Sequence, residues 1–163
     1  MKQKFLLRLI LSLMLSGFMY TVFAQDSMKM LPPVVVYTKA NVNKAVTKSF
    51  DKMFKDAVDP QWYKMDKNFL VKFITGDMDN NALFRKNGSL VYHIQYGQEH
   101  NLPADIRSQV QNAYSEYNIT RAIKIKAGER NIWVVNLEGL KKYVIVSVED
   151  GELQEVQSYT KAG

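Results

Sequence analysis

Histidine and cysteine are the side chains that most often supply acid–base, nucleophilic or metal chemistry near neutral pH, and this sequence is poor in both. It has two histidines, His93 and His100, and no cysteine. The histidines lie seven positions apart (100 − 93), which is not a spacing of the common zinc motifs. The serines lie in no Gly-x-Ser-x-Gly turn of the kind that presents a nucleophile. We therefore predict that the protein has no catalytic residue and is not an enzyme.

Carboxylate and amide oxygens gather in the stretch TGDMDNN, where cation binding would be the expected chemistry. A calcium loop needs acidic residues and a glycine at fixed positions and a closing glutamate, and this stretch does not follow that pattern. Clusters of Asp and Asn are typical of hairpin turns. We predict no cofactor and no metal site, and weak cation binding at Asp77 and Asp79 is the alternative.

Two segments have the apolar spacing of helices that cover a core. In NVNKAVTKSFDKMFKDAVDP the apolar residues recur every three or four positions, which predicts an amphipathic helix that ends before Asp59-Pro60. In NLPADIRSQVQNAYSEY the same spacing predicts a second helix, with Pro103 in its first turn.

The residues that follow each helix alternate apolar and polar side chains with a period of two, as half-buried strands do. Between Trp62 and Gly97 we expect three antiparallel strands, and a fourth if QWYKMD pairs. The strands expected after the second helix are ITRAIKIK, NIWVVNLEG and KKYVIVSVEDG, with ELQEVQSY as a fourth. The hairpin signals Asn87-Gly88 and Asp150-Gly151 fall at matching places in the two halves. The pattern predicts an α+β fold, a tandem repeat of a helix plus an antiparallel sheet.

The alternation also sorts the strand residues into two faces. The set expected to pack under the helices is Phe69, Val71, Phe73, Trp133, Val135, Leu137, Val144, Val146 and Val148. The set expected on the opposite face is Leu70, Ile74, Ile132, Val134, Tyr143 and Ile145. A solvated face should carry polar side chains, and an exposed apolar patch usually marks an interface. We predict that this second set contacts an unknown protein partner or a second copy of the chain.

The N-terminal stretch MKQKFLLRLILSLMLSGFMYTVFAQDS has the basic start and the apolar run of a secretory signal. Val22 and Ala24 occupy the third-last and last positions before a cut at Gln25, where signal peptidase needs small residues. We expect residues 1–24 to be a removed signal peptide, residues 25–41 a leader with a possible edge strand, and residues 42–160 the folded domain. A lipid anchor is excluded because it needs a cysteine at the cut.

Removal of residues 1–24 takes away three of the 22 basic residues, which leaves 19 against 16 acidic ones and a formal charge of +3. That balance is too small to predict nucleic-acid binding. No second apolar run of that length follows the signal, so we expect no membrane contact after cleavage and a location in the periplasm or outside the cell.

The sequence resembles the PepSY-like, β-lactamase-inhibitor-like (BLIP-like) exported domains of Bacteroidetes. The stretches that carry the resemblance are DPQWYKMDKNFLVKFI, ALFRKNGSLVYHIQYGQEHNLPADIRSQVQNAY, YNITRAIKI and WVVNLEG with VSVEDGEL. The resemblance covers roughly residues 42–159 and rests on architectural residues. It implies tandem helix-plus-sheet units, an exported location, and binding or inhibition as the class of activity.

These observations together predict an exported, non-catalytic binding or inhibitory module that uses its open sheet face. The alternative is an envelope protein that binds a small ligand or a cation near Asp77 and Asp79.

The export prediction has a direct test in the mass of the intact protein from its native host. We expect the mature chain to begin at Gln25, because the small residues that direct the cut end at Ala24. A mature species that retains Met1 would show that the N-terminal stretch is not a cleaved signal.

Overall fold

A computed structural model describes residues 38–39 and 41–162 of the chain. The expected signal peptide (residues 1–24) and the possible edge strand in the VVVY stretch (residues 34–37) lie outside the described residues. Among the residues that the structure describes, no helix has the length and hydropathy needed to cross a membrane.

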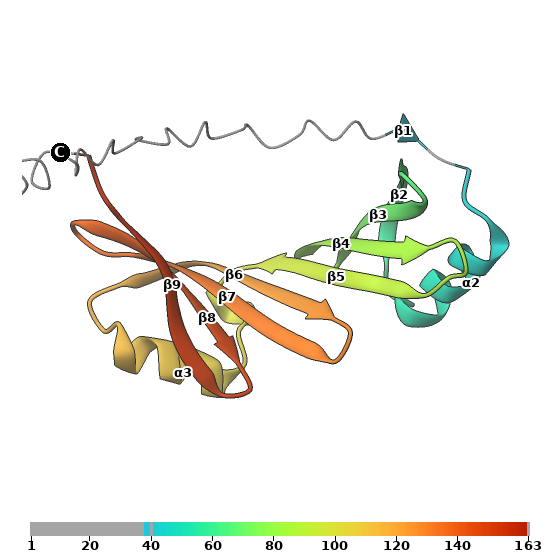
Figure 1. The fold of residues 1–163 in the computed structure, drawn as a ribbon. Coiled ribbons are helices and arrows are strands. Elements are labelled where there is room, and N and C mark those ends of the chain that lie inside the picture. The colour runs from blue at the N-terminus through green and yellow to red at the C-terminus, as the bar shows by residue number, and fades with distance from the viewer. Residues whose placement is uncertain (1–37, 40, 163) are drawn as a thin grey trace, which may run out of the picture. The chain divides into compact units, whose positions relative to one another are not determined.

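One antiparallel sheet of nine strands runs through the described residues, and its strands are arranged in chain order (Figure 1). A helix followed by four strands occurs twice along the chain. The elements of the first half are β1 (Thr38–Lys39), α2 (Lys44–Met53), β2 (Val58–Met65), β3 (Asn68–Thr75), β4 (Met78–Arg85) and β5 (Leu90–Gly97). Those of the second half are the short 3₁₀ helix η1 (Glu99–Asn101), α3 (Ala104–Ala113), β6 (Asn118–Ala127), β7 (Arg130–Glu138), β8 (Lys142–Glu149) and β9 (Glu152–Thr160). The α+β class expected from the sequence is confirmed.

Both of the strands that the sequence left open are present. β2 pairs with β3 and β9 pairs with β8, so each helix is followed by four strands. The first helix is shorter than expected, because it ends at Met53 and Asp59-Pro60 already belong to β2. Pro60 fits there because β2 shifts its register between Val58 and Gln61, and proline is tolerated at such an irregularity.

Helix α2 begins where its sequence supplies a cap. Asn43 Oδ1 accepts a hydrogen bond of 3.0 Å from the backbone N–H of Val46, which satisfies one of the free donors at the helix start. Val46 and Phe50, one turn apart, are buried against the sheet. In α3 the residue before the helix is Pro103, which makes no side-chain cap, and Val110 is the buried residue.

The strand register shows that both helices cover the same face of the sheet. Residues paired directly across neighbouring strands point to one face. One such row crosses the sheet from the first half to the second and consists of Phe73, Asn80, Gln95, Lys124, Trp133 and Val148. Phe73 packs in the core with α2, and Val148 packs in the core with α3. Each helix therefore lies on the same side, α2 beside β2–β5 and α3 beside β6–β9 (Figure 1).

The described residues form two hydrophobic cores, one under each helix. The core under α2 contains Val46, Phe50, Phe69, Val71, Phe73, Ala82 and Phe84. The core under α3 contains Leu102, Val110, Ala122, Val135, Leu137, Val144, Val146 and Val148, with Trp133 partly buried beside them. All of the strand residues that the sequence assigned to the helix-facing side are in these cores, so that prediction is confirmed.

Each helix also contacts the hairpin between the third and fourth of the four strands that follow it. Asn43 Nδ2 donates 2.9 Å to the carbonyl of Lys86 in the β4–β5 turn, and Gly88 of that turn is buried. In the second half, Gln109 Nε2 of α3 donates 2.8 Å to the carbonyl of Gly151 in the β8–β9 turn. The two Gly-containing turns are thus anchoring points for the helices.

Substitution of each glycine by alanine separates two effects: the cost of a positive φ and the cost of a clash with the helix. Gly88 and Gly151 have φ of +85° and +81°, which L-residues adopt at a cost of about 1–2 kcal/mol. A Cβ at Gly88 would also lie 2.6 Å from both Ala45 O and Ser49 Oγ, whereas one at Gly151 would have nothing within 4 Å. We expect Gly88→Ala to lower the free energy of unfolding by about 1–3 kcal/mol more than Gly151→Ala, because of overpacking against α2.

Urea denaturation of the two variants measures the difference. Equal losses of stability would show that α2 does not pack closely on the β4–β5 turn.

Candidate functional site

His93 lies on the helix-covered face, partly buried beside the core under α2. Its ring packs against Phe54, with 4.7 Å between centroids, and stacks on Phe73 at 5.9 Å. His93 Nε2 lies 2.9 Å from Oδ1 of Asn80, which is itself buried. This hydrogen bond and the packing hold the ring inside the protein.

The hydrogen bonds of Asn80 determine which nitrogen of His93 carries the proton. Asn80 Nδ2 donates to Thr75 Oγ1 at 2.9 Å and to the carbonyl of Met78 at 2.8 Å. Because a carbonyl only accepts, the amide nitrogen of Asn80 must face Met78, and Asn80 Oδ1 faces His93 as an acceptor. His93 therefore donates from Nε2. Burial, together with the charges of Lys124 and Lys126, lowers the pKa of His93 to about 4, so the ring is neutral at physiological pH.

The second histidine, His100, lies in η1 and pairs with the β3–β4 turn. Its Nε2 bonds to Oδ2 of Asp77, and Asn101 Nδ2 donates 3.0 Å to Oδ1 of the same carboxylate. The hydrogen bond from His100, followed by that from Asn101, holds the pKa of the Asp77 carboxyl below its usual value. Neither His93 nor His100 is hydrogen-bonded to a serine in the part of the chain that the structure describes.

The structure does not bring Asp77 and Asp79 to one site. Asp77 is engaged by His100 and Asn101 in the turn, whereas Asp79 lies in β4 and lines a hollow on the opposite side of the sheet from α2. Within residues 38–39 and 41–162, no group of three or more His, Cys, Asp or Glu side chains is placed to hold a metal ion.

The sheet face opposite the helices, called here the open face, is the main candidate for an interaction site. None of the described helices packs against it. The register brings five apolar side chains from three adjacent strands together at its middle, which we call the open-face centre: Ile94 of β5, Ile123 and Ile125 of β6, and Ile132 and Val134 of β7. All five are partly exposed. The open-face centre is thus a continuous apolar area on the surface of the described residues.

The predicted partner-binding residues lie in three different places. Ile132 and Val134 belong to the open-face centre. Ile145 and Tyr143 lie on the same face in β8, across from Asn136 and Glu138. Ile74 is 41% exposed at the β3 end of the open face, far from the other four in the strand order.

Leu70 corrects one expectation. It faces away from α2 as predicted, but it is only 3% exposed and is not accessible to a partner. The reason is its place in the register, between Tyr63 of β2 and Leu83 of β4, whose large side chains flank it on the same face.

Sequence reasoning missed Ile94, Ile123 and Ile125, which complete the open-face centre. The alternation of apolar residues was visible in each strand, but these residues form one apolar area only because β5 pairs with β6. That pairing sets Ile94 opposite Ile125 and Tyr96 opposite Ile123, across a connection that contains η1 and α3.

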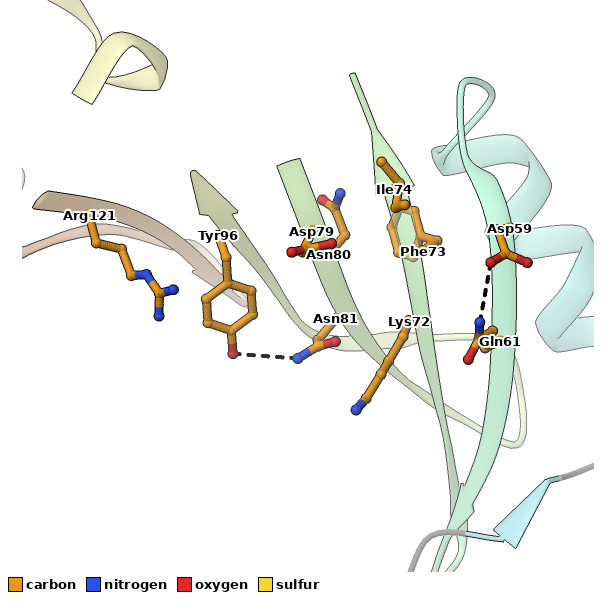
Figure 2. A pocket seen from close by; sticks show the side chains of 10 residues that line it. All are labelled: Asp59, Gln61, Lys72, Phe73, Ile74, Asp79, Asn80, Asn81, Tyr96 and Arg121. Atoms are coloured by element: carbon orange, nitrogen blue, oxygen red, sulfur yellow. Dashed lines mark hydrogen bonds between the residues drawn. The ribbon is translucent and has the colours of Figure 1, made fainter. Parts of the chain in front are cut away.

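A hollow of about 420 Å³ lies on the open face, lined by residues of strands β2 to β6 (Figure 2). It is lined by Asp59, Gln61, Lys72, Phe73, Ile74, Asp79, Asn80, Asn81, Tyr96 and Arg121. Tyr96 stands between Arg121 on one side and Asp79 on the other in this view. Asn81 Nδ2 donates to the Tyr96 hydroxyl at 3.4 Å, which helps to orient the phenol ring. The hollow thus combines charges of both signs with exposed apolar surface.

Comparisons with known proteins show the fold. No protein-family model and no curated protein matches the sequence. Among solved structures, a BLIP-like protein of Bacteroides fragilis matches with a TM-score of 0.59 and 14% identity, over 76% of this chain and 91% of that protein. A DUF2874 family protein of Bacteroides ovatus matches with a TM-score of 0.57 and 14% identity, over 74% of this chain and 89% of that one. A Bacteroides eggerthii structure named "putative periplasmic proteins" matches with a TM-score of 0.56 and 12% identity, over 74% and 90%. The chain has the fold of these proteins, as the resemblance in its sequence indicated.

The environment of His93 predicts acid sensitivity. In the unfolded chain a histidine titrates near 6.5, whereas folded His93 takes up its proton only near pH 4. The unfolded state therefore binds more protons between these values, and the free energy of unfolding should fall as the pH is lowered from 6.5 towards 4. We expect His93→Gln, which keeps a donor for Asn80, to show a smaller fall.

Denaturant titrations of both proteins at pH 8, 6.5 and 5 give the comparison. Parallel pH profiles for the two proteins would show that His93 is not held neutral by the fold.

Proposed function

From this shared fold we propose that the protein is an exported, non-catalytic binding or inhibitory module that acts in the periplasm or outside the cell. Its open face holds an unidentified protein partner or a second copy of the chain. The open-face centre carries this proposal, because a continuous apolar area that no described helix covers is unusual on a sheet with one solvated face.

The size of the apolar area supports a protein as the occupant. Burial of one large aliphatic side chain contributes about 1.5–3 kcal/mol, so a single exposed residue does not drive association but several adjacent ones can. The open-face centre places five such side chains on three hydrogen-bonded strands. Because the strands hold these residues in place, a partner would bind a surface that is already ordered.

The exported location rests on the signal-like N-terminal stretch and on the name of the Bacteroides eggerthii neighbour, which calls that protein periplasmic. The proposal that the protein is non-catalytic rests on the surroundings of its two histidines. His93 is neutral and bonded to Asn80, and His100 is bonded to Asp77. Neither is placed against a nucleophile that it could activate.

We also propose that the two halves are a tandem repeat of one helix-plus-sheet unit. The order of one helix and four strands occurs twice, and the glycine turns with positive φ join the third and fourth strands in both halves. Each of these turns contacts its own helix, Gly88 through Ala45 and Gly151 through Gln109.

Threonine substitution on the two faces tests the use of the open face. Val134→Thr with Ile145→Thr keeps the β-branched shape that suits a strand while it removes apolar surface. We expect this double variant to lose association with little change in thermal stability, because both side chains are partly exposed. The matched control is Val135→Thr, which changes the neighbouring residue on the helix-covered face. Val135 is 0% exposed, so this control should unfold at a clearly lower temperature.

Association is measured in two ways. Sedimentation velocity reports self-association, and a photo-crosslinking amino acid at Ser147, which pairs with Val134, reports contact with a partner in exporting cells. The same crosslinker at Ala113, exposed on α3, should give no product. A large loss of stability in the double variant, or crosslinks that are unchanged by it, would contradict a role for the open face.

A further inference from the structure

The hollow on the open face holds two charged side chains that the rest of the described protein does not neutralise. Asp79 of β4 is exposed, and so is Arg121 of β6. The salt bridges between described residues join His100 to Asp77, Arg130 to Glu149, and Lys161 to Glu138, and none includes Asp79 or Arg121. Two opposite charges in one hollow that form no pair with each other are available to a ligand that carries both.

The other two charges of the hollow are engaged within the protein. Gln61 Nε2 donates to Asp59 Oδ2 at 3.2 Å, and Gln61 Oε1 accepts from the hydroxyl of Tyr63 at 2.9 Å. The ammonium group of Lys72 lies 5.5 Å from the centre of the Tyr63 ring, which draws it towards β2. Asp79 and Arg121 are therefore the charges that would meet a ligand directly.

The spacing of the strands sets the length of such a ligand. Asp79 and Arg121 lie on β4 and β6, with β5 and Tyr96 between them. Neighbouring strands are about 4.8 Å apart, so the two backbones are separated by about 10 Å. Tyr96 pairs with Ile123, and Arg121 lies two residues away along β6, so Asp79 and Arg121 are about 12 Å apart along the sheet. After allowance for one hydrogen bond of about 3 Å at each end, the positive and negative groups of the ligand are about 6 Å apart. The ammonium and carboxylate groups of a dipeptide or tripeptide span that distance.

The apolar and polar groups of the hollow also fit the parts of a peptide between its two charged ends. Ile74 and Tyr96 are the cross-strand neighbours of Asp79 on either side, so the residue that carries the ammonium group would have an apolar side chain. The Tyr96 hydroxyl accepts from Asn81, which leaves its own hydrogen free to donate to a peptide carbonyl. The volume of about 420 Å³ is in the range of small-ligand sites.

We propose that the hollow binds a short peptide with free termini, whose ammonium group pairs with Asp79 and whose carboxylate pairs with Arg121. The first residue of the peptide packs between Ile74 and Tyr96. This site is independent of the protein partner proposed for the open-face centre, because its charged contacts lie at Asp79 and Arg121 and not at the five residues of that centre.

The test uses three forms of one dipeptide, phenylalanyl-alanine, titrated into the exported protein and followed by amide chemical shifts. The free dipeptide should shift the amides around Asp79, Tyr96 and Arg121 in a saturable way. Acetylation of its amino group or amidation of its carboxylate should each weaken binding about tenfold, because each removes one charge pair. Equal binding of all three forms, or no saturable shift, would overturn the proposal.

Two variants assign the charges to the termini. Asp79→Asn should weaken binding of the free dipeptide about tenfold and abolish the difference between the free and acetylated forms. Arg121→Gln should likewise abolish the difference between the free and amidated forms. The controls Asp105→Asn and Lys126→Gln change exposed charges outside the hollow and should leave all affinities unchanged.

If acetylation still weakens binding in Asp79→Asn, the peptide does not pair with that carboxylate and the proposal is wrong. Shifts confined to the open-face centre would also overturn it. The peptide titration and the crosslinking at Ser147 have separate readouts, so either site can fail without the other.

Discussion

The pairing of β5 with β6 is the interaction on which the rest of the structure depends, because it joins the two helix-plus-sheet halves into one sheet. A β-sheet has a side-chain period of two, so a continuous register across this junction forces both helices onto one face. A shift of the pairing by one residue would turn all of the second-half core residues away from the side covered by α2. The junction therefore determines which side of the protein is left without a described helix.

Among the described residues, no hydrophobic core bridges this junction on the helix-covered face. The residues that pair there include Gln95 with Lys124 and His93 with Lys126, and they separate the core under α2 from the core under α3. On the open face the same two strands pair Ile94 with Ile125 and Tyr96 with Ile123. The apolar contact that joins the halves is thus on the side away from the helices. The open-face centre is therefore also part of the contact between the two halves of the sheet.

The helix-facing residues could be predicted from alternation because the strands that carry them, β3, β7 and β8, keep an unbroken register in the β3–β4 and β7–β8 pairs. Alternation gives the wrong face where a register shift interrupts the period. Strict alternation places Leu90 on the same face as Tyr92, but the irregularity between Leu83 and Phe84 in the pairing with β5 puts Leu90 against the core under α2. The predicted face of Leu70 was correct, but its predicted exposure was wrong. Burial depends on the side chains of neighbouring strands, which the pattern of a single strand does not contain.

The sequence by itself determined the helices, the faces of most strands and the glycine turns. These are local properties, set by spacing within a few residues and by the backbone freedom of glycine at positions such as Gly88. Only the tertiary structure decided that β5 pairs with β6, and with it the open-face centre and the meeting of Asp79, Tyr96 and Arg121 in one hollow. The physical reason is that the register between strands separated by a whole helix depends on how the complete sheet packs, and no local pattern encodes it.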